Sequence, residues 1–296
     1  MRVEIQKLDK LKRKLKIEVS GKEFSKEKEE FYKQTSKNLK VPGFRPGTAP
    51  LDLIEKHHGK ALREEFVKKS IPQFYRKALE EEKILPASMP KIYDLDLKDD
   101  SMVFFAEFET RPELKIDESV YKGIKIKEKI EPIKEIEIEK IITNLKDGIK
   151  RTLNKDLADD DIAKWASYAN ANALREAIKA QLHIEKIRER RQKIDNQIKQ
   201  HLLKNVKVDL PAEEVKRHLS DVVDRQMYSL QQRGTSKEDV EKYRKDLEEK
   251  LKDVATDEVK LFYILEAIAK QEGIKIDNNL GEVILGLILS QAQYSS

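Results

Sequence analysis

The five histidines are the first side chains to consider for chemistry, because imidazole binds metals and transfers protons near neutral pH. His57 and His58 are adjacent, and His183, His201 and His218 lie far apart along the chain. No two histidines have the i, i+4 spacing that places two ligands on one helix face, and the chain has no cysteine. We therefore predict neither a metal site nor a cofactor.

Runs of carboxylates are the next candidates, since paired acids act as general acids and bases. Three glutamates occupy residues 80–82 and three aspartates occupy residues 159–161. Adjacent carboxylates are more typical of hydrated helices and turns. The sequence also has no glycine-rich phosphate loop, nucleophile elbow or Ser/His/Asp arrangement. We therefore predict no catalytic residue and an action that does not depend on ATP.

The most distinctive segment is residues 41–50, VPGFRPGTAP, with two glycines and three prolines. This composition predicts a loop. Phe44 would expose an aromatic face on a proline-stiffened tip, and Arg45 would add a planar cation that pairs with phosphate or carboxylate. Such a pair suits a ribonucleoprotein surface. In the alternative, Phe44 folds back into a local core and Arg45 only keeps the loop solvated.

Positive charge is concentrated near the amino terminus. Residues 1–50 hold 14 Lys and Arg against 7 Asp and Glu, whereas the remaining residues hold 46 against 48. A basic end on a nearly neutral body predicts docking on an anionic partner such as nucleic acid or a ribonucleoprotein. The alternative is that lysines only keep a sheet edge soluble.

The loop is expected inside an α+β domain of residues 1–111. Alternating apolar residues predict strands at 2–8, 12–20, 91–97 and 102–110. Between them, helical spacing predicts one helix over 27–40, started by Ser25, and two more separated by Gly59. The order is therefore two strands, helices and two strands.

The rest of the chain reads as mostly helical, since charged residues reach 39% and glycine and proline are few. Residues 112–155 are predicted as an extended linker and a connecting helix that begins at Pro132. Residues 156–296 are predicted as an elongated helical body with arms, in which a long helix starts at Asn172 and carries one apolar stripe. Further helices are expected to end at Arg233 and about Glu272, with a cap at Ser236.

Two apolar features of the body leave alternatives open. Trp165 either pins a helix junction, the favoured interpretation, or lines a groove. The stripe of Val283, Ile284, Leu287 and Ile288 either closes the body or forms an open surface or dimer contact. No apolar run has the length of a signal peptide core or a membrane span, so we expect a cytoplasmic protein without membrane contact.

The loop resembles the G-F-R-x-G-K-x-P signature of trigger factor, the bacterial ribosome-associated chaperone. The similarity covers residues 1 to about 150 and includes Ile84-Leu85-Pro86-Ala87 and the stretch from Phe104 to Leu114. It resumes more weakly in the helical half, around Val208-Asp209-Leu210-Pro211.

The resemblance implies an ATP-independent chaperone that holds nascent or unfolded polypeptides and docks at the exit of the ribosomal peptide tunnel. It also implies roles in protein folding, protein transport and cell division, and leaves a homodimer open. The implied ribosome-binding residues are Gly43, Phe44, Arg45, Pro46, Gly47, Thr48 and Pro50. The alternative function is an elongated helical adaptor that binds RNA or a ribonucleoprotein through its basic head.

Three departures from the family pattern affect these expectations. Thr48 replaces the lysine of the signature, which removes one exposed charge contact of about 1 kcal/mol; Lys37 and Lys40 are candidates to compensate. Only about twenty residues stand where the family carries a prolyl isomerase domain, so we expect no isomerase activity although the family is usually labelled with it. The carboxy terminus is short, which predicts that one arm is incomplete.

Overall fold

The computed structural model describes residues 1–36, 39, 41–44, 50–127, 132–232 and 237–295. The chain divides into two compact units. The first consists of Met1–Leu114 and Val208–Tyr263, and the second of Lys115–Lys207 and Ile264–Ser296. We call residues 1–114 the head.

The head contains a four-stranded antiparallel sheet in the order β1-β2-β4-β3. Its strands are β1 (Arg2–Lys7), β2 (Lys12–Ser20), β3 (Lys91–Leu97) and β4 (Ser101–Glu109). Leu15, Ile17 and Val19 alternate into the core, and Ile17 lies opposite Phe104 on β4. The four predicted strands are therefore confirmed, because period-two alternation correctly identifies strands with one buried face.

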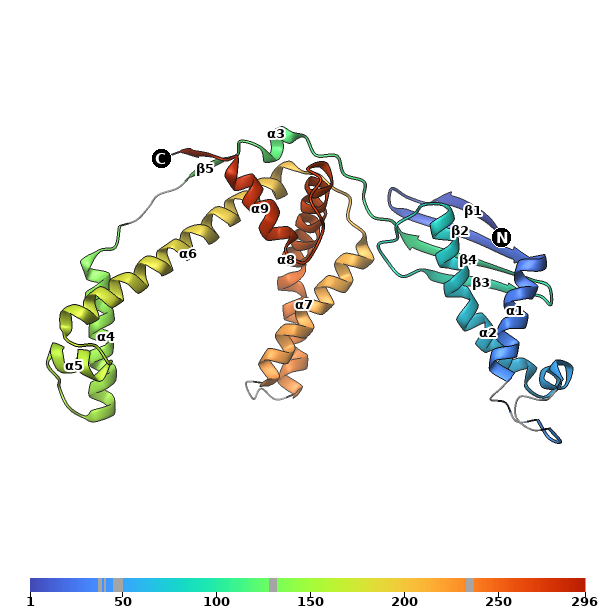
Figure 1. The fold of residues 1–296 in the computed structure, drawn as a ribbon, viewed down its shortest axis with the longest axis horizontal. Helices are drawn as coiled ribbons and strands as arrows, with labels where there is room; N and C mark the ends of the chain where they lie inside the picture. Colours follow the sequence, from blue (N-terminus) through green and yellow to red (C-terminus); the bar gives the residue numbers. More distant parts are fainter. Residues whose placement is uncertain (37–38, 40, 45–49, 128–131, 233–236, 296) are drawn as a thin grey trace. The chain divides into compact units, whose positions relative to one another are not determined.

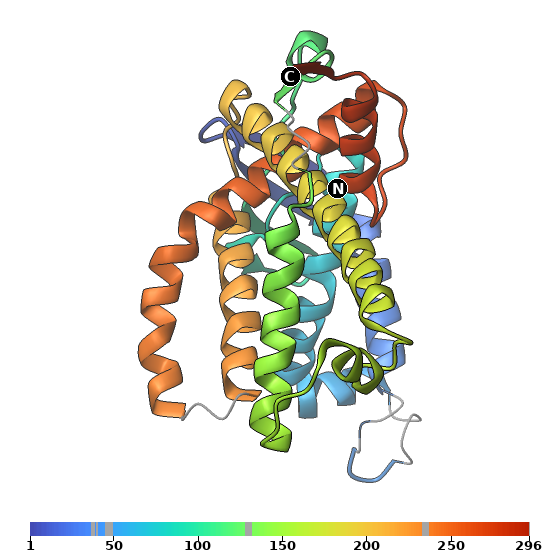
Figure 2. The same cartoon turned by 90° about the vertical axis from the view of Figure 1, so that its left-hand side faces the viewer.

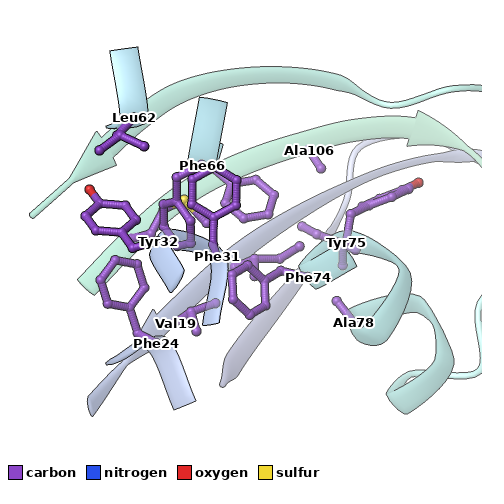
Figure 3. Packing of buried hydrophobic residues seen from close by; sticks show 14 of the residues in the cluster. Val19, Phe24, Phe31, Tyr32, Leu62, Phe66, Phe74, Tyr75, Ala78 and Ala106 are labelled. Atoms are coloured by element: carbon purple, nitrogen blue, oxygen red, sulfur yellow. The ribbon is translucent and has the colours of Figure 1, made fainter. Parts of the chain in front are cut away.

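Two helices, α1 (Gly21–Ser36) and α2 (Leu51–Glu81), pack on the sheet in the head (Figure 1). Aromatic rings fill the space between them and the strands (Figure 3). Phe66 is at the centre, with its ring centroid 5.6 Å from that of Phe24, 5.5 Å from that of Phe31 and 6.4 Å from that of Tyr32. Several of these rings meet edge to face, a geometry that adds to the free energy of burial.

The predicted helix break at Gly59 is wrong, because α2 runs without interruption from Leu51 to Glu81. An interior glycine costs about 1 kcal/mol, whereas each large apolar side chain buried on this helix contributes about 1.5–3 kcal/mol. Ile54, Leu62 and Phe66 lie on both sides of Gly59 and are all buried. The helix α1 also starts earlier than expected, at Gly21, since the fully buried Phe24 belongs to it.

The first unit also contains α7 (Ala212–Gln232) and the part of α8 (Lys237–Gln271) up to Tyr263. Val223 and Met227 of α7 form the buried centre of their contact, with Leu247 and Leu251 of α8 packed against them. The helix restart after Pro211 is thus confirmed. Arg233 and the expected cap Ser236 lie outside the described residues.

The second unit combines long helices with a small sheet (Figures 1 and 2). Its elements are α3 (Glu118–Tyr121), β5 (Lys125–Lys127), α4 (Glu135–Leu153), α5 (Asp159–Trp165), α6 (Ala171–Asn205), the end of α8, α9 (Leu280–Ser290) and β6 (Gln293–Ser295). The helices α4 and α5 pack on the first half of α6, and β5 pairs in parallel with β6.

The expected extended connection after the head is only partly correct, because the helix α3 interrupts it, whereas β5 is itself extended. Both form where one side chain is buried: Tyr121 is 1% exposed and Ile126 is fully buried. The start of α4 also differs from the predicted Pro132. Lys134 is the N-cap, and its backbone N–H donates to the Glu137 carboxylate at 2.8 Å.

The long helix from residue 171 is confirmed, but its apolar stripe is not covered throughout. Leu174, Ile178, Ile194 and Ile198 are buried, whereas Ile187 between them is 51% exposed. An uncovered apolar residue inside a buried stripe marks a place where the helix lacks a partner.

The structure also bears on the two apolar features for which the sequence left alternatives, Trp165 and the stripe that begins at Val283. Trp165 is 54% exposed, which contradicts the interpretation that it pins a helix junction, since such a ring would be buried. In α9, Ile284 and Ile288 are fully buried and Val283 is 46% exposed, so most of that stripe closes the body.

Candidate docking loop and apolar-basic groove

The two ends of the glycine- and proline-rich loop are fixed to the head. Val41 is buried in the head core, and its carbonyl accepts a hydrogen bond from the Phe44 N–H at 3.1 Å. At the other end, Pro50 precedes α2, and its carbonyl accepts from the N–H groups of Leu53 and Ile54, each at 3.1 Å. The loop is thereby held at both of its ends.

Gly43 has φ +84°, in the left-handed region that side chains with a Cβ avoid. A Cβ at this position would meet no atom within 4 Å, so the requirement for glycine is conformational and not steric. Phe44 follows directly and is 42% exposed. The alternative in which Phe44 folds back into the core is therefore wrong.

The rest of the predicted docking site lies outside the described residues: Arg45, Pro46, Gly47 and Thr48. The same holds for Lys37 and Lys40. Of the predicted site, the structure places Gly43, Phe44 and Pro50, which lie between the end of α1 and the start of α2 in the sequence.

A second site lies in the second unit, where a groove of about 600 Å³ separates α6 from the chain that leads into α4. Its apolar part consists of Pro132, Ile133, Ile187 and Ile194. Basic side chains surround these residues: Lys127, Lys179, Lys186, Arg190 and Lys193. His183, Gln197 and the carboxylates of Glu137 and Glu189 complete the lining.

Lys186 holds the two sides of this groove together. Its ammonium group lies 2.8 Å from the Glu137 carboxylate and donates to the Pro132 carbonyl at 3.1 Å. The hydrogen bond from Lys186, and then that from the Lys134 backbone, lower the pKa of Glu137 below its usual range. At the far end, the Gln197 amide accepts from the Lys127 N–H at 3.0 Å and donates to the Lys127 carbonyl at 2.9 Å.

Ion pairs also fix α4 and α5 to their neighbours. Arg175 of α6 pairs with Glu135 at 2.7 Å and with Glu139. Lys146 of α4 lies 2.6 Å from Asp159 at the start of α5, and this contact lowers the pKa of Asp159. One predicted acidic run therefore serves to position a helix.

A polar cluster joins α3 to the end of α8 within the second unit. The buried Tyr121 hydroxyl donates to Glu272 at 2.6 Å, and Lys122 lies 2.9 Å from the same carboxylate. Burial, followed by the contact with Glu272, raises the pKa of Tyr121 to about 12. The hydrogen bonds from Tyr121 and Lys122 lower the pKa of Glu272. These contacts hold α3 and the chain just beyond α8 together.

The groove offers apolar side chains beside cations, an arrangement that fits binding of a ligand. Within the described ranges, no three His, Asp or Glu side chains group as a metal site would require. No helix in the described part of the chain is both long enough and apolar enough to cross a membrane. The sequence reasoning missed the groove, although Ile187 on the apolar stripe, among lysines and arginines, is the signal that could have found it.

Two family models match the chain. The model described as "Bacterial trigger factor protein (TF)" matches residues 1–145, and the model described as "Bacterial trigger factor protein (TF) C-terminus" matches residues 170–280. Residues 146–169, between the matched segments, contain the end of α4 and the short helix α5.

Curated relatives agree with these matches. A trigger factor from Oceanobacillus iheyensis is 38% identical over 117 residues, which is 38% of this chain and 27% of the relative. One from Acinetobacter baumannii is 29% identical over 145 residues, or 49% of this chain and 32% of the relative. The chain thus matches about a third or less of these relatives' length.

The solved structure is described as "Promiscuous Substrate Recognition in Folding and Assembly Activities of the Trigger Factor Chaperone". It aligns over 98% of this chain and 100% of its own, with a TM-score of 0.57 and 14% identity. This likeness establishes the fold.

Proposed function

Because this chain belongs to the trigger factor family, we propose that it is an ATP-independent chaperone that docks on the ribosome with its head and holds nascent chains with its helical body. The curated relatives bear the name trigger factor, and the solved structure is described as that of a chaperone with promiscuous substrate recognition.

Exposure of Phe44 is the observation that carries the docking proposal. The ring is 42% exposed on a loop fixed at Val41 and Pro50. An aromatic ring that is presented on a held loop loses little conformational entropy on binding. We propose that Gly43, Phe44, Arg45, Pro46, Gly47, Thr48 and Pro50 form the ribosome-binding segment near the tunnel exit.

Client holding is supported by apolar side chains that remain exposed among charged ones. Besides Ile187, they include Ile184 and Trp165 in the second unit and Tyr228 and Tyr243 on α7 and α8. Such scattered contacts give weak, multivalent and exchangeable binding with little sequence selectivity.

Isomerase activity is proposed to be absent. The helices α4, α5 and α6 follow one another between residues 135 and 205, and turns of only a few residues connect them. This stretch leaves no room for an inserted half-barrel of about a hundred residues. An isomerisation assay on a proline-containing peptide tests the proposal, and measurable catalysis would contradict it.

Aggregation of a chemically denatured client, followed by light scattering after dilution into nucleotide-free buffer, tests the holding function. We expect suppression at near-stoichiometric amounts of this protein. A helical adaptor would leave aggregation unchanged and would bind free RNA through its head.

We further propose a cytoplasmic location and a division of the chain into three parts, residues 1–111, 112–155 and 156–296. Analytical ultracentrifugation tests whether the chain forms a homodimer.

A further inference from the structure

The groove on α6 combines an aliphatic floor with an excess of positive charge. Among the described residues, five basic side chains line it against two carboxylates. Glu137 is already paired with Lys186 at 2.8 Å. Glu189, Lys127, Lys179 and Lys193 also line the groove and can face an occupant. In the described part of the chain, Lys127, Lys179 and Lys193 form no ion pair with a carboxylate.

We propose that this groove selects extended client segments in which acidic residues alternate with aliphatic ones, an inference that rests on the chaperone function proposed above. The apolar side chains of such a segment would lie on Ile133, Ile187 and Ile194. Its carboxylates would pair with Lys179 and Lys193 on the rim.

The dimensions of the groove fit a short peptide. Its volume of about 600 Å³ falls within the range of about 300–1,000 Å³ that is typical of ligand sites. The two rim lysines, Lys179 and Lys193, are fourteen residues apart on one helix, a span of about 21 Å. An extended peptide covers that distance with roughly six residues.

The chemistry of the floor favours a polypeptide over a nucleic acid. Proteins that bind single-stranded nucleic acids stack the bases on aromatic side chains. The described lining contains no Phe, Tyr or Trp, and its apolar residues are proline and isoleucine. Aliphatic side chains of a client match this floor, and a carboxylate satisfies the lysines as a phosphate would.

Fluorescence anisotropy with labelled twelve-residue peptides tests the proposal on the full chain. One peptide alternates Leu or Ile with Asp or Glu, a second carries Asn and Gln in place of the acids, and a third carries Lys. At low ionic strength we expect the acidic peptide to bind about ten-fold more tightly than the neutral one, with a smaller ratio in higher salt. Equal affinities for the three peptides would overturn the proposal.

Variants with matched controls locate the site. Lys179→Gln/Lys193→Gln should weaken binding of the acidic peptide several-fold, whereas Lys199→Gln/Lys204→Gln removes the same charge from α6 outside the groove and should change nothing. Ile187→Asp should weaken both the acidic and the neutral peptide. Leu153→Asp at the end of α4 is its control, since Leu153 is 43% exposed and does not line the groove. Identical effects of variant and control would overturn the assignment.

Two further readouts separate the possible failures. If the wild type suppresses aggregation but does not discriminate among the peptides, the groove proposal fails and the chaperone function stands. If the wild type does not suppress aggregation, the proposed function itself fails. A single-stranded RNA oligonucleotide that displaces the acidic peptide at lower concentration than the unlabelled peptide does would contradict the choice of a polypeptide.

Discussion

The head and the three-helix segment of α4, α5 and α6 are stabilised in different ways. Edge-to-face aromatic rings around Phe66 form the centre of the head, enclosed by a sheet and two helices. The buried cluster of α4 to α6 contains only aliphatic side chains, and exposed ion pairs such as that of Arg175 hold its helices together. Exposed ion pairs contribute little free energy. The head is therefore expected to resist local opening more strongly than the segment of α4 to α6.

The largest expected loss of stability comes from the aromatic core of the head. Phe66 is 1% exposed and contacts three other rings. Phe66→Ala should lower the free energy of unfolding of the head by about 3–5 kcal/mol, because it removes buried area and leaves a cavity. Urea denaturation monitored by hydrogen exchange of head amides measures this. A loss below about 1 kcal/mol would show that the head is not the well-packed region.

The corresponding change in the aliphatic cluster should have a smaller and more local effect. Ile178 is 6% exposed and packs among the side chains of α4 and α5. Ile178→Ala should cost about 2 kcal/mol, the low end for such substitutions, because a loosely packed site can relax. Hydrogen exchange should accelerate in α4 to α6 and remain unchanged in the head. Acceleration in the head as well would contradict the independence of the two regions.

Acidification should lower the stability of the second unit, with a smaller effect than the two core substitutions. Folding lowers the pKa of Glu137, Asp159 and Glu272. A carboxylate with a lowered folded pKa contributes stability above its unfolded pKa, about 4 for these residues, and this contribution is lost as the pH falls through the folded pKa. The melting temperature should therefore fall below about pH 4.

Glu137→Gln/Glu272→Gln should reduce this pH dependence, as measured by thermal melting monitored by circular dichroism across the acid range. Glu176→Gln/Glu282→Gln is the control, since it removes the same charge from exposed positions of the same unit. Equal pH dependence in the two double variants would show that the ion pairs of Lys186 and Lys122 and the hydrogen bond of Tyr121 do not contribute to the effect.

Much of the head could be predicted from local sequence patterns, whereas parts of the second unit could not. The alternation around Ile17 and Phe104 identified the strands because a half-buried strand has a period of two. The small elements around Tyr121 depend instead on Glu272, which lies 151 residues further along the chain. A local pattern carries no information about such a contact.

The same reason explains the errors at Gly59 and in the groove. The continuity of α2 is decided by the burial of Leu62 and Phe66 in the head core and not by the glycine itself. The groove arises because the chain around Pro132 approaches Ile187, more than fifty residues later in the sequence. The exposure of Phe44, by contrast, followed from the composition of its own loop.

Co-sedimentation with bacterial ribosomes tests the central claim most directly. Phe44→Ala/Arg45→Ala should leave the stability of the head within about 0.5 kcal/mol of wild type, because Phe44 is exposed. The control is Tyr228→Ala/Arg225→Ala, which removes an exposed aromatic and an arginine from α7. We expect salt-sensitive binding for the wild type and the control, and loss of binding for the loop variant. Absence of wild-type binding, or undiminished binding by the loop variant, would contradict docking through Phe44.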